Sequence, residues 1–74
     1  MKVLIMHDND FSKAQILEDM HEEGFLHEFL FVEDALDLVD AIREADEIWT
    51  FGDARNFVEA VTARQMRKDV WEMG

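Results

Sequence analysis

The stretch MKVLIMHDND, residues 1–10, opens with an apolar run and ends in polar side chains. Val3 to Met6 is unbroken apolar sequence of strand length, which is typical of a strand covered on both faces in a parallel sheet. We therefore predict a buried strand that passes into a helix and carries polar groups at its carboxyl end. These polar residues are His7, Asp8, Asn9 and Asp10.

The rest of the chain alternates between helical and strand patterns. Ser12 and Gln15 fit a reciprocal capping box, and Gly24 is well placed to end the helix in a left-handed turn. The expected elements after the first strand are a helix from Asp10 or Ser12 to Gly24, a strand over 26–32, a helix over 33–44, a strand over 48–51 and a helix over 54–73.

Each helix is expected to turn one apolar stripe toward the sheet and its charged side chains toward water. The stripes are Phe11, Ala14, Ile16, Leu17 and Met20 in the first helix, Ala35, Leu36, Val39 and Ile42 in the second, and Phe57, Val58 and Val61 in the third.

Regular alternation of strands and helices favours right-handed crossovers and a parallel sheet. With the first strand in the middle, the strand order is 2-1-3. We predict one three-layer α/β domain over residues 1–74, which resembles half of a flavodoxin-like or Rossmann-like domain.

Acidic side chains dominate the composition, with 18 Asp and Glu against 7 Lys and Arg and a net charge of −11. Thirteen of the acids and a single base lie between Ala14 and Ala54, whereas four bases and three acids follow from Arg55 onward. Such a field repels phosphate backbones and anionic lipid, so we expect no direct binding to nucleic acid or membrane. Nearly half of the residues are apolar, 49%, which favours a folded core over disorder.

The chain has no cysteine, so neither disulfides nor thiolate metal sites are available to it. Its first apolar run is far shorter than the ~20 residues that cross a bilayer, and its flanks do not resemble a signal peptide. We expect a cytoplasmic protein.

Polar residues from two strands are expected to meet at one edge of the sheet, where ligands collect in parallel α/β folds. We predict a ligand-binding rim there. Its carboxylates have the oxygen ligands that Mg²⁺ prefers, but side chains of this kind also cap any strand-to-helix loop, so we assign no metal or cofactor. The residues of this rim are His7, Asp8, Asp10 and Asp53.

The stretch KVLIMHDNDFSKAQILEDMHEEGF resembles the opening of response-regulator receiver domains. In that family a strand ends in a pair of acids that hold Mg²⁺, and an aspartate after the third strand accepts phosphate. Asp8 matches one of the acids, while His7 stands in the place of the other.

The stretch ALDLVDAIREADEIWTFGDARNFVEA is similar to the nucleoside 2-deoxyribosyltransferase-like superfamily. Family members run a helix into "aDevwvfgd" and carry a pattern close to D-S-G-T-x-x-E, whose spacing Asp53 and Glu59 keep. The resemblance implies a nucleoside- or nucleotide-binding domain. If the domain is hydrolytic, its catalytic residues are Asp53 and Glu59, and Glu59 is the nucleophile. Arg55 and Asn56 replace the glycine and threonine of the pattern, so the resemblance supports the fold more than the chemistry.

Closely spaced acids on the second helix repel one another and weaken the helix by a few tenths of a kcal/mol per pair. Solubility is one explanation for them, and recognition of a basic surface is another. On the second explanation, the protein binds and modulates or inhibits a larger macromolecule, as a small phage protein or nucleic-acid mimic does, and lysine at Asp37, Asp40 and Glu44 abolishes binding. The residues of this acidic face are Glu33, Asp37, Asp40 and Glu44.

The predicted last helix continues its apolar stripe beyond the reach of a three-stranded sheet. Tryptophan and methionine are frequent at interfaces. We expect this helix to form a homodimer or to dock onto another protein, and its contact residues are Met66, Val70 and Trp71.

Overall fold

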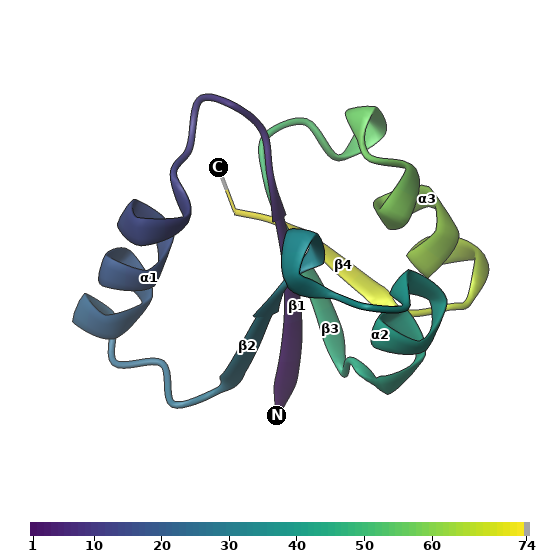
Figure 1. Cartoon of the computed structure of the whole chain (residues 1–74), viewed down its shortest axis with the longest axis horizontal. Coiled ribbons are helices and arrows are strands. Elements are labelled where there is room, and N and C mark those ends of the chain that lie inside the picture. Colours follow the sequence, from purple (N-terminus) through teal and green to yellow (C-terminus); the bar gives the residue numbers. More distant parts are fainter. Residues whose placement is uncertain (74) are drawn as a thin grey trace.

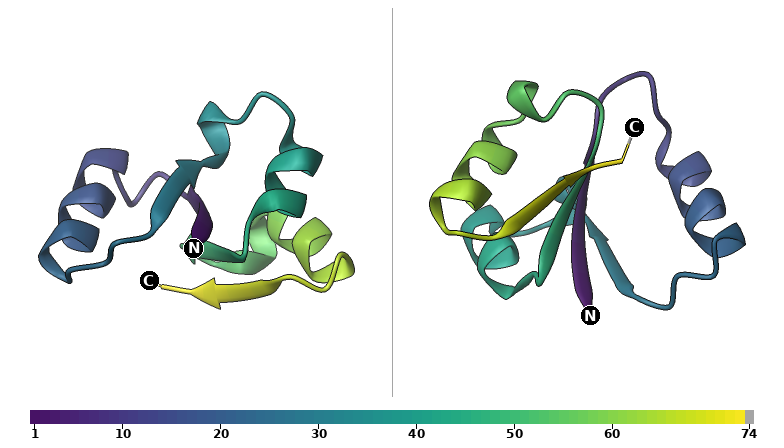
Figure 2. Two further views of the ribbon diagram at one scale, coloured as in Figure 1. Left: turned by 90° about the horizontal axis from the view of Figure 1, so that it is seen from below. Right: turned by 180° about the vertical axis from the view of Figure 1, so that it is seen from behind.

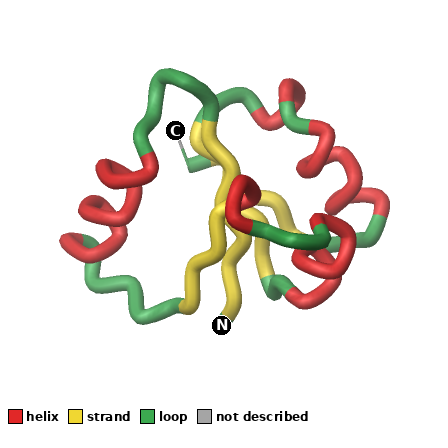
Figure 3. Tube along the Cα trace, in the orientation of Figure 1, coloured by secondary structure: helices red, strands yellow, loops and turns green. Residues whose placement is uncertain are grey.

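The computed structural model describes residues 1–73, and over this range it is an α/β fold with an all-parallel sheet. The strand order is β2-β1-β3-β4, so the predicted 2-1-3 arrangement is confirmed and gains a fourth strand at one edge (Figures 1 and 3). Gly74, the last residue of the predicted domain, lies outside the described residues. The elements are β1 (Lys2–His7), α1 (Lys13–Glu22), β2 (Glu28–Phe31), η1 (Val32–Asp34), α2 (Leu38–Glu44), β3 (Glu47–Phe51), η2 (Ala54–Asn56), α3 (Val58–Gln65) and β4 (Asp69–Glu72).

The central strand β1 has a hydrogen-bonded neighbour on each side. It pairs with β2 from Lys2↔Glu28 onward and with β3 from Val3↔Glu47 onward. The four residues from Val3 to Met6 are all buried, with at most 3% of each exposed. The apolar run at the start of the chain is therefore explained by burial on both faces.

Helix α1 lies on one face of the sheet, and α2 and α3 lie on the other (Figure 2). Each face carries one apolar cluster. Because successive side chains of a strand point to opposite faces, Val3 and Ile5 pack with α1 while Leu4 and Met6 pack with α2 and α3. Helix α1 contributes Ile16 and Met20 to its cluster. The other face receives Ile42 from α2 and Ala60 and Ala63 from α3.

The predicted ends of the first helix are confirmed. Ser12 is the N-cap of α1, and its hydroxyl accepts a hydrogen bond from the Gln15 backbone N–H at 3.1 Å. Gly24 has φ of 76°, the left-handed conformation expected after the helix. The reciprocal half of the capping box is wrong, because the Gln15 side chain instead donates to Asp19 at 3.0 Å. The predicted stripe is also too wide, since Ala14 and Leu17 are exposed.

The second helix, predicted from residue 33, begins five residues later, at Leu38. Residues 32–34 form η1, and Asp37 is the N-cap of α2, accepting from the Asp40 backbone N–H at 3.1 Å. The face of α2 that packs against the core therefore differs from the predicted stripe and consists of Leu38, Ala41 and Ile42. Leu36 and Val39, predicted to be buried, are exposed.

The prediction of one helix over 54–73 is wrong. Helix α3 ends at Gln65, and Arg67 has φ of 62°, a left-handed conformation that is uncommon outside glycine. The N–H groups of Lys68 and Arg67 donate to the carbonyls of Ala63 and Arg64, at 2.9 and 3.0 Å, which is the hydrogen-bond pattern of a Schellman cap. The chain then turns back and adds β4 to the free edge of β3.

Small residues bring α3 close to the sheet. Ala60 and Ala63 are completely buried, whereas Val58 and Val61, which were predicted to pack on the sheet, are 75% and 46% exposed. Phe57 packs partly against the same cluster, as predicted.

We expect Arg67→Gly to stabilise the protein by about 0.5–1 kcal/mol. The left-handed conformation costs a non-glycine residue roughly 1–2 kcal/mol, and the greater unfolded-state freedom of glycine offsets part of that gain. Urea unfolding measures the change in the free energy of unfolding. If residues 54–73 formed one uninterrupted helix, the same substitution would lower the free energy of unfolding by about 1 kcal/mol. The sign of the measured change therefore decides between that helix and the left-handed turn at Arg67. Arg67→Ala, which keeps a Cβ, is the matched control and should show no gain.

Candidate functional site

The loops after β1 and β3 meet at the carboxyl edge of the sheet, as parallel topology requires. The Asp8 backbone N–H donates to the Phe51 carbonyl at 3.0 Å. Gly52 has φ of 131°, and a Cβ at this position would lie 2.3 Å from Asp8 Oδ2. Glycine leaves room for the Asp8 carboxylate beside the backbone. The expected meeting of the two loops is therefore confirmed.

The carboxylates at this rim are engaged in local hydrogen bonds. Asp8 accepts from the Asp10 backbone N–H at 3.0 Å. Asp53 accepts from the Arg55 guanidinium at 2.6 Å and from the Arg55 backbone N–H at 3.0 Å, and these hydrogen bonds lower the pKa of Asp53 to about 2. Within residues 1–73, no group of three or more His, Asp or Glu side chains is placed to hold a metal ion. Asp8, Asp10 and Asp53 thus do not form the oxygen cluster that Mg²⁺ requires.

His7 is the one titratable side chain of this rim that links two elements. Its Nδ1 lies 3.1 Å from the Asp8 carbonyl and its Nε2 lies 3.2 Å from Glu33 Oε1, so both nitrogens face hydrogen-bond acceptors. Only the doubly protonated ring donates to both. Desolvation lowers the pKa of His7, but the hydrogen bonds to Asp8 and Glu33 and the Glu33 charge outweigh it and raise the pKa above its ordinary value.

A depression of about 320 Å³ lies beside His7, where η1 and the first turn of α3 border the end of β1. Glu59, one of the two predicted catalytic alternatives, lines this depression, but Asp53 does not. The Glu33 and Glu59 carboxylates and the Phe57 ring of this depression suit a ligand with hydroxyl or amine groups. The negative charge of the two carboxylates disfavours phosphate. The lining residues are Ile5, Met6, His7, Asn9, Val32, Glu33, Phe57 and Glu59.

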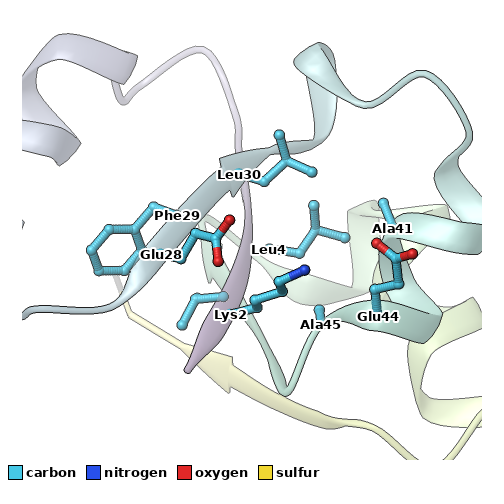
Figure 4. A pocket seen from close by; sticks show the side chains of 9 residues that line it. Lys2, Leu4, Glu28, Phe29, Leu30, Ala41, Glu44 and Ala45 are labelled. Atoms are coloured by element: carbon cyan, nitrogen blue, oxygen red, sulfur yellow. The ribbon is translucent and has the colours of Figure 1, made fainter.

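A groove between the open edge of β2 and helix α2 is the second candidate site, and we call it the β2–α2 groove. It consists of two adjoining depressions, of about 230 and 310 Å³, whose linings share Leu30, Ala41 and Glu44. Figure 4 shows its inner part, where Glu28 from β2 and Glu44 from α2 lie on opposite sides. The residues are Lys2, Val3, Leu4, Glu28, Phe29, Leu30, Ala41, Glu44 and Ala45 in the inner part and Asp34, Ala35, Leu36, Asp37 and Asp40 in the outer part.

Carboxylates outnumber amines in this groove, since only Lys2 opposes its acids. Some of these acids have local partners. Asp34 pairs with Lys13, Asp40 with Arg43 at 3.2 Å, and Asp37 caps α2. Within the described residues, Glu28 and Glu44 accept no hydrogen bond from another side chain. These two carboxylates are therefore free to meet cations from outside.

Apolar side chains are exposed beside the same groove. Leu36 is fully exposed and Leu30 is 41% exposed. Large apolar side chains next to unpaired charges mark interaction surfaces more often than scattered single residues do. The groove thus offers both charge and apolar contact.

The predicted partner-binding residues lie in three separate places. Asp37, Asp40 and Glu44 line the β2–α2 groove, while Glu33 is held by His7. Met66, Val70 and Trp71 are not on one helical stripe: Met66 is the C-cap of α3 and the other two belong to β4. Sequence reasoning gave no site role to Lys2, Glu28 and Leu30, because strand pairing brings them beside α2.

Comparisons of this chain with family models, with curated proteins and with solved structures gave no match. Over the described residues, every helix is too short or too polar to span a lipid bilayer.

We expect the His7–Glu33 contact to make stability depend on pH. The pKa of His7 is raised in the folded state, so its stabilising contribution is fully present below the unfolded-state pKa of about 6.5 and is lost as the pH rises through the folded value. Glu33→Gln should lower the pKa of His7 and should destabilise the protein more at pH ~5.5 than at pH ~8, on either side of that ordinary pKa.

The pKa is measured by NMR titration of the His7 ring protons, and stability by urea unfolding at both pH values. Glu18→Gln, which makes the same charge change on exposed α1, is the matched control. An unchanged His7 pKa in Glu33→Gln would contradict this account of the contact.

Proposed function

We propose that this chain is an acidic protein-interaction module of the cytoplasm that binds a basic, extended segment of a larger macromolecule. The observation that carries the proposal is the β2–α2 groove, which places free carboxylates and exposed leucines beside an open strand edge. Such a groove recognises backbone, charge and apolar side chains together.

The open edge of β2 supplies backbone hydrogen bonds for an added strand. The Glu28 N–H donates to the Met1 carbonyl at 2.9 Å, so Glu28 and Leu30 direct their backbone groups toward β1. By strand alternation, Phe29 and Phe31 direct theirs outward. An extended segment that pairs with these groups becomes a fifth strand of the sheet.

Side chains of the added segment then meet the groove. Alternate residues of an extended chain point to the same face, here toward α2. Lysine or arginine at these positions lies near Glu28 and Glu44, and apolar residues contact Leu30 and Leu36. The net charge of −11 attracts such a segment from a distance.

Inhibition is the expected consequence when the bound segment normally contacts nucleic acid. Lysine and arginine occupied by carboxylates are not available to phosphates. The proposal therefore includes the behaviour of a phage-type inhibitor or nucleic-acid mimic that acts on a basic surface.

We expect a synthetic peptide of alternating lysine and valine to bind with an affinity that falls steeply with salt. Asp40→Lys and Glu44→Lys, combined with Asp37→Asn, should raise its Kd on the order of tenfold or more, because exposed ion pairs contribute roughly 0.2–1 kcal/mol each. Asparagine is chosen at position 37 because it retains the N-cap of α2. Titration calorimetry at low and high ionic strength measures the change.

The matched control makes the same change of net charge on α1, with Glu18→Lys, Glu22→Lys and Glu23→Gln, and should bind the peptide far better than the groove variant. Binding that is indifferent to salt, or equally weakened in both variants, would argue against the groove. Capture from a cell lysate at low and high salt then identifies the natural partner.

We propose nucleoside binding as the second candidate function, because Glu59 lines one depression with His7, Asn9 and Phe57. A nucleoside offers hydroxyls to the carboxylates and a base to the aromatic ring. The resemblance to nucleoside 2-deoxyribosyltransferases supports this candidate and gives Glu59 the role of the nucleophile should hydrolysis occur.

Addition of a nucleoside should shift the backbone amide signals of His7, Asn9 and Glu59 in NMR spectra. A nucleoside monophosphate should shift them less, because carboxylates repel its phosphate. Glu59→Gln, which keeps the shape of the side chain, should weaken the response. Absence of any shift in these residues at millimolar nucleoside leaves this candidate without support.

A further inference from the structure

The outer edge of β4 is a second open strand edge, opposite the β2–α2 groove in the sheet. The Met73 N–H donates to the Thr50 carbonyl at 2.8 Å, so Met73 and Trp71 direct their backbone groups toward β3. By strand alternation, Val70 and Glu72 direct their N–H and C=O groups outward. Within residues 1–73 no further strand covers them.

The apolar face beside this edge is only partly covered. Trp49 and Trp71 are register partners in β3 and β4 and so lie on the same face of the sheet, the face on which α1 packs. Trp49 is 5% exposed, but Trp71 is 54% exposed and Met73 is 40% exposed. Coverage of this face therefore ends at β3.

Charge separates the two edges of the sheet. Around β4, the three bases Arg64, Arg67 and Lys68 outnumber the two acids Asp69 and Glu72. The β2 edge, in contrast, is bordered mainly by carboxylates. Two copies of a chain with a net charge of −11 repel each other at most surfaces, but at β4 they meet mixed charges.

We propose that β4 pairs antiparallel with β4 of a second copy across a twofold axis, so that the two sheets become one. A twofold axis perpendicular to the sheet places the same face of both copies on the same side of the joined sheet. Residues that lie opposite each other across the axis must therefore point to the same face. Pairing centred on Val70 meets this condition, because the N–H and C=O of Val70 pair with those of Val70 in the second copy and the Glu72 N–H donates to the Lys68 carbonyl of the second copy. The Lys68 N–H keeps its hydrogen bond to the Ala63 carbonyl at 2.9 Å.

This register also matches opposite charges. Lys68 of each copy lies across from Glu72 of the second copy, and Trp71 lies across from Asp69 of the second copy, whose carboxylate can accept from the indole N–H. Both tryptophans become less exposed, and the β2–α2 grooves stay free at the two outer ends. The inference does not depend on the proposed function of those grooves.

Sedimentation velocity from micromolar to millimolar protein tests the proposal, and we expect an equilibrium between one and two copies. Lys68→Glu and Glu72→Lys should each raise the dimer Kd on the order of tenfold, because the dimer contains two Lys68–Glu72 pairs and each substitution turns both into pairs of like charge. The double variant should restore most of the affinity. Thermal unfolding reports the loss of the internal hydrogen bond from Lys68 to the Arg43 carbonyl separately.

Val70→Pro is the second variant, since proline removes an N–H that points away from β3 and blocks an added strand. It should yield one copy at all concentrations, and circular dichroism checks that it is folded. Glu18→Lys on α1, which makes the same charge change as Glu72→Lys at an exposed position, is the control and should leave self-association intact. The proposal would be overturned if the wild-type chain stayed a single copy at millimolar concentration or if its mass grew beyond two copies. It would also be overturned if substitution of Lys68 and Glu72 left the dimer Kd unchanged.

Discussion

The structure depends on one constraint, which is that β1 is almost completely shielded from water between Val3 and Met6. Its side chains are buried on both faces, and its backbone groups pair with β2 on one edge and with β3 on the other. An unpaired peptide group in such a place costs a few kcal/mol, so both ladders must form. Polar chemistry begins only where this strand leaves the core, at His7 and Asp8.

Much of the architecture could be predicted because burial leaves a strong pattern in sequence. An unbroken apolar strand, the Ser12 cap and Gly24 indicated the parallel sheet and the first helix. The C-terminal strand could not be predicted, because Arg67 adopts the left-handed turn that glycine usually marks. Without a glycine at that position, the sequence pattern predicts that the helix continues through residues 66–73. The inward face of α2 was missed for a related reason, since Asp37 caps the helix in place of the earlier acids.

Residues of the candidate sites were harder to predict than the fold, since hydrogen bonds rearrange polar side chains locally. Asp53 reached the expected edge but is held by Arg55, and Asp8 is held by the Asp10 backbone. Glu33, which sequence spacing placed with the acids of the second helix, instead contacts His7. The β2–α2 groove depends on strand pairing, which brings Glu28 within reach of α2 and which no local pattern encodes.

The central place of the first strand has a consequence for synthesis on the ribosome. Strand β1 needs neighbours on both edges, and its partners in β3 lie more than forty residues further along the chain. Stable pairing must therefore wait until β3 has also left the ribosome. During that interval Val3 to Met6 is a bare apolar segment, which makes the nascent chain a natural client for chaperones that hold hydrophobic sequence.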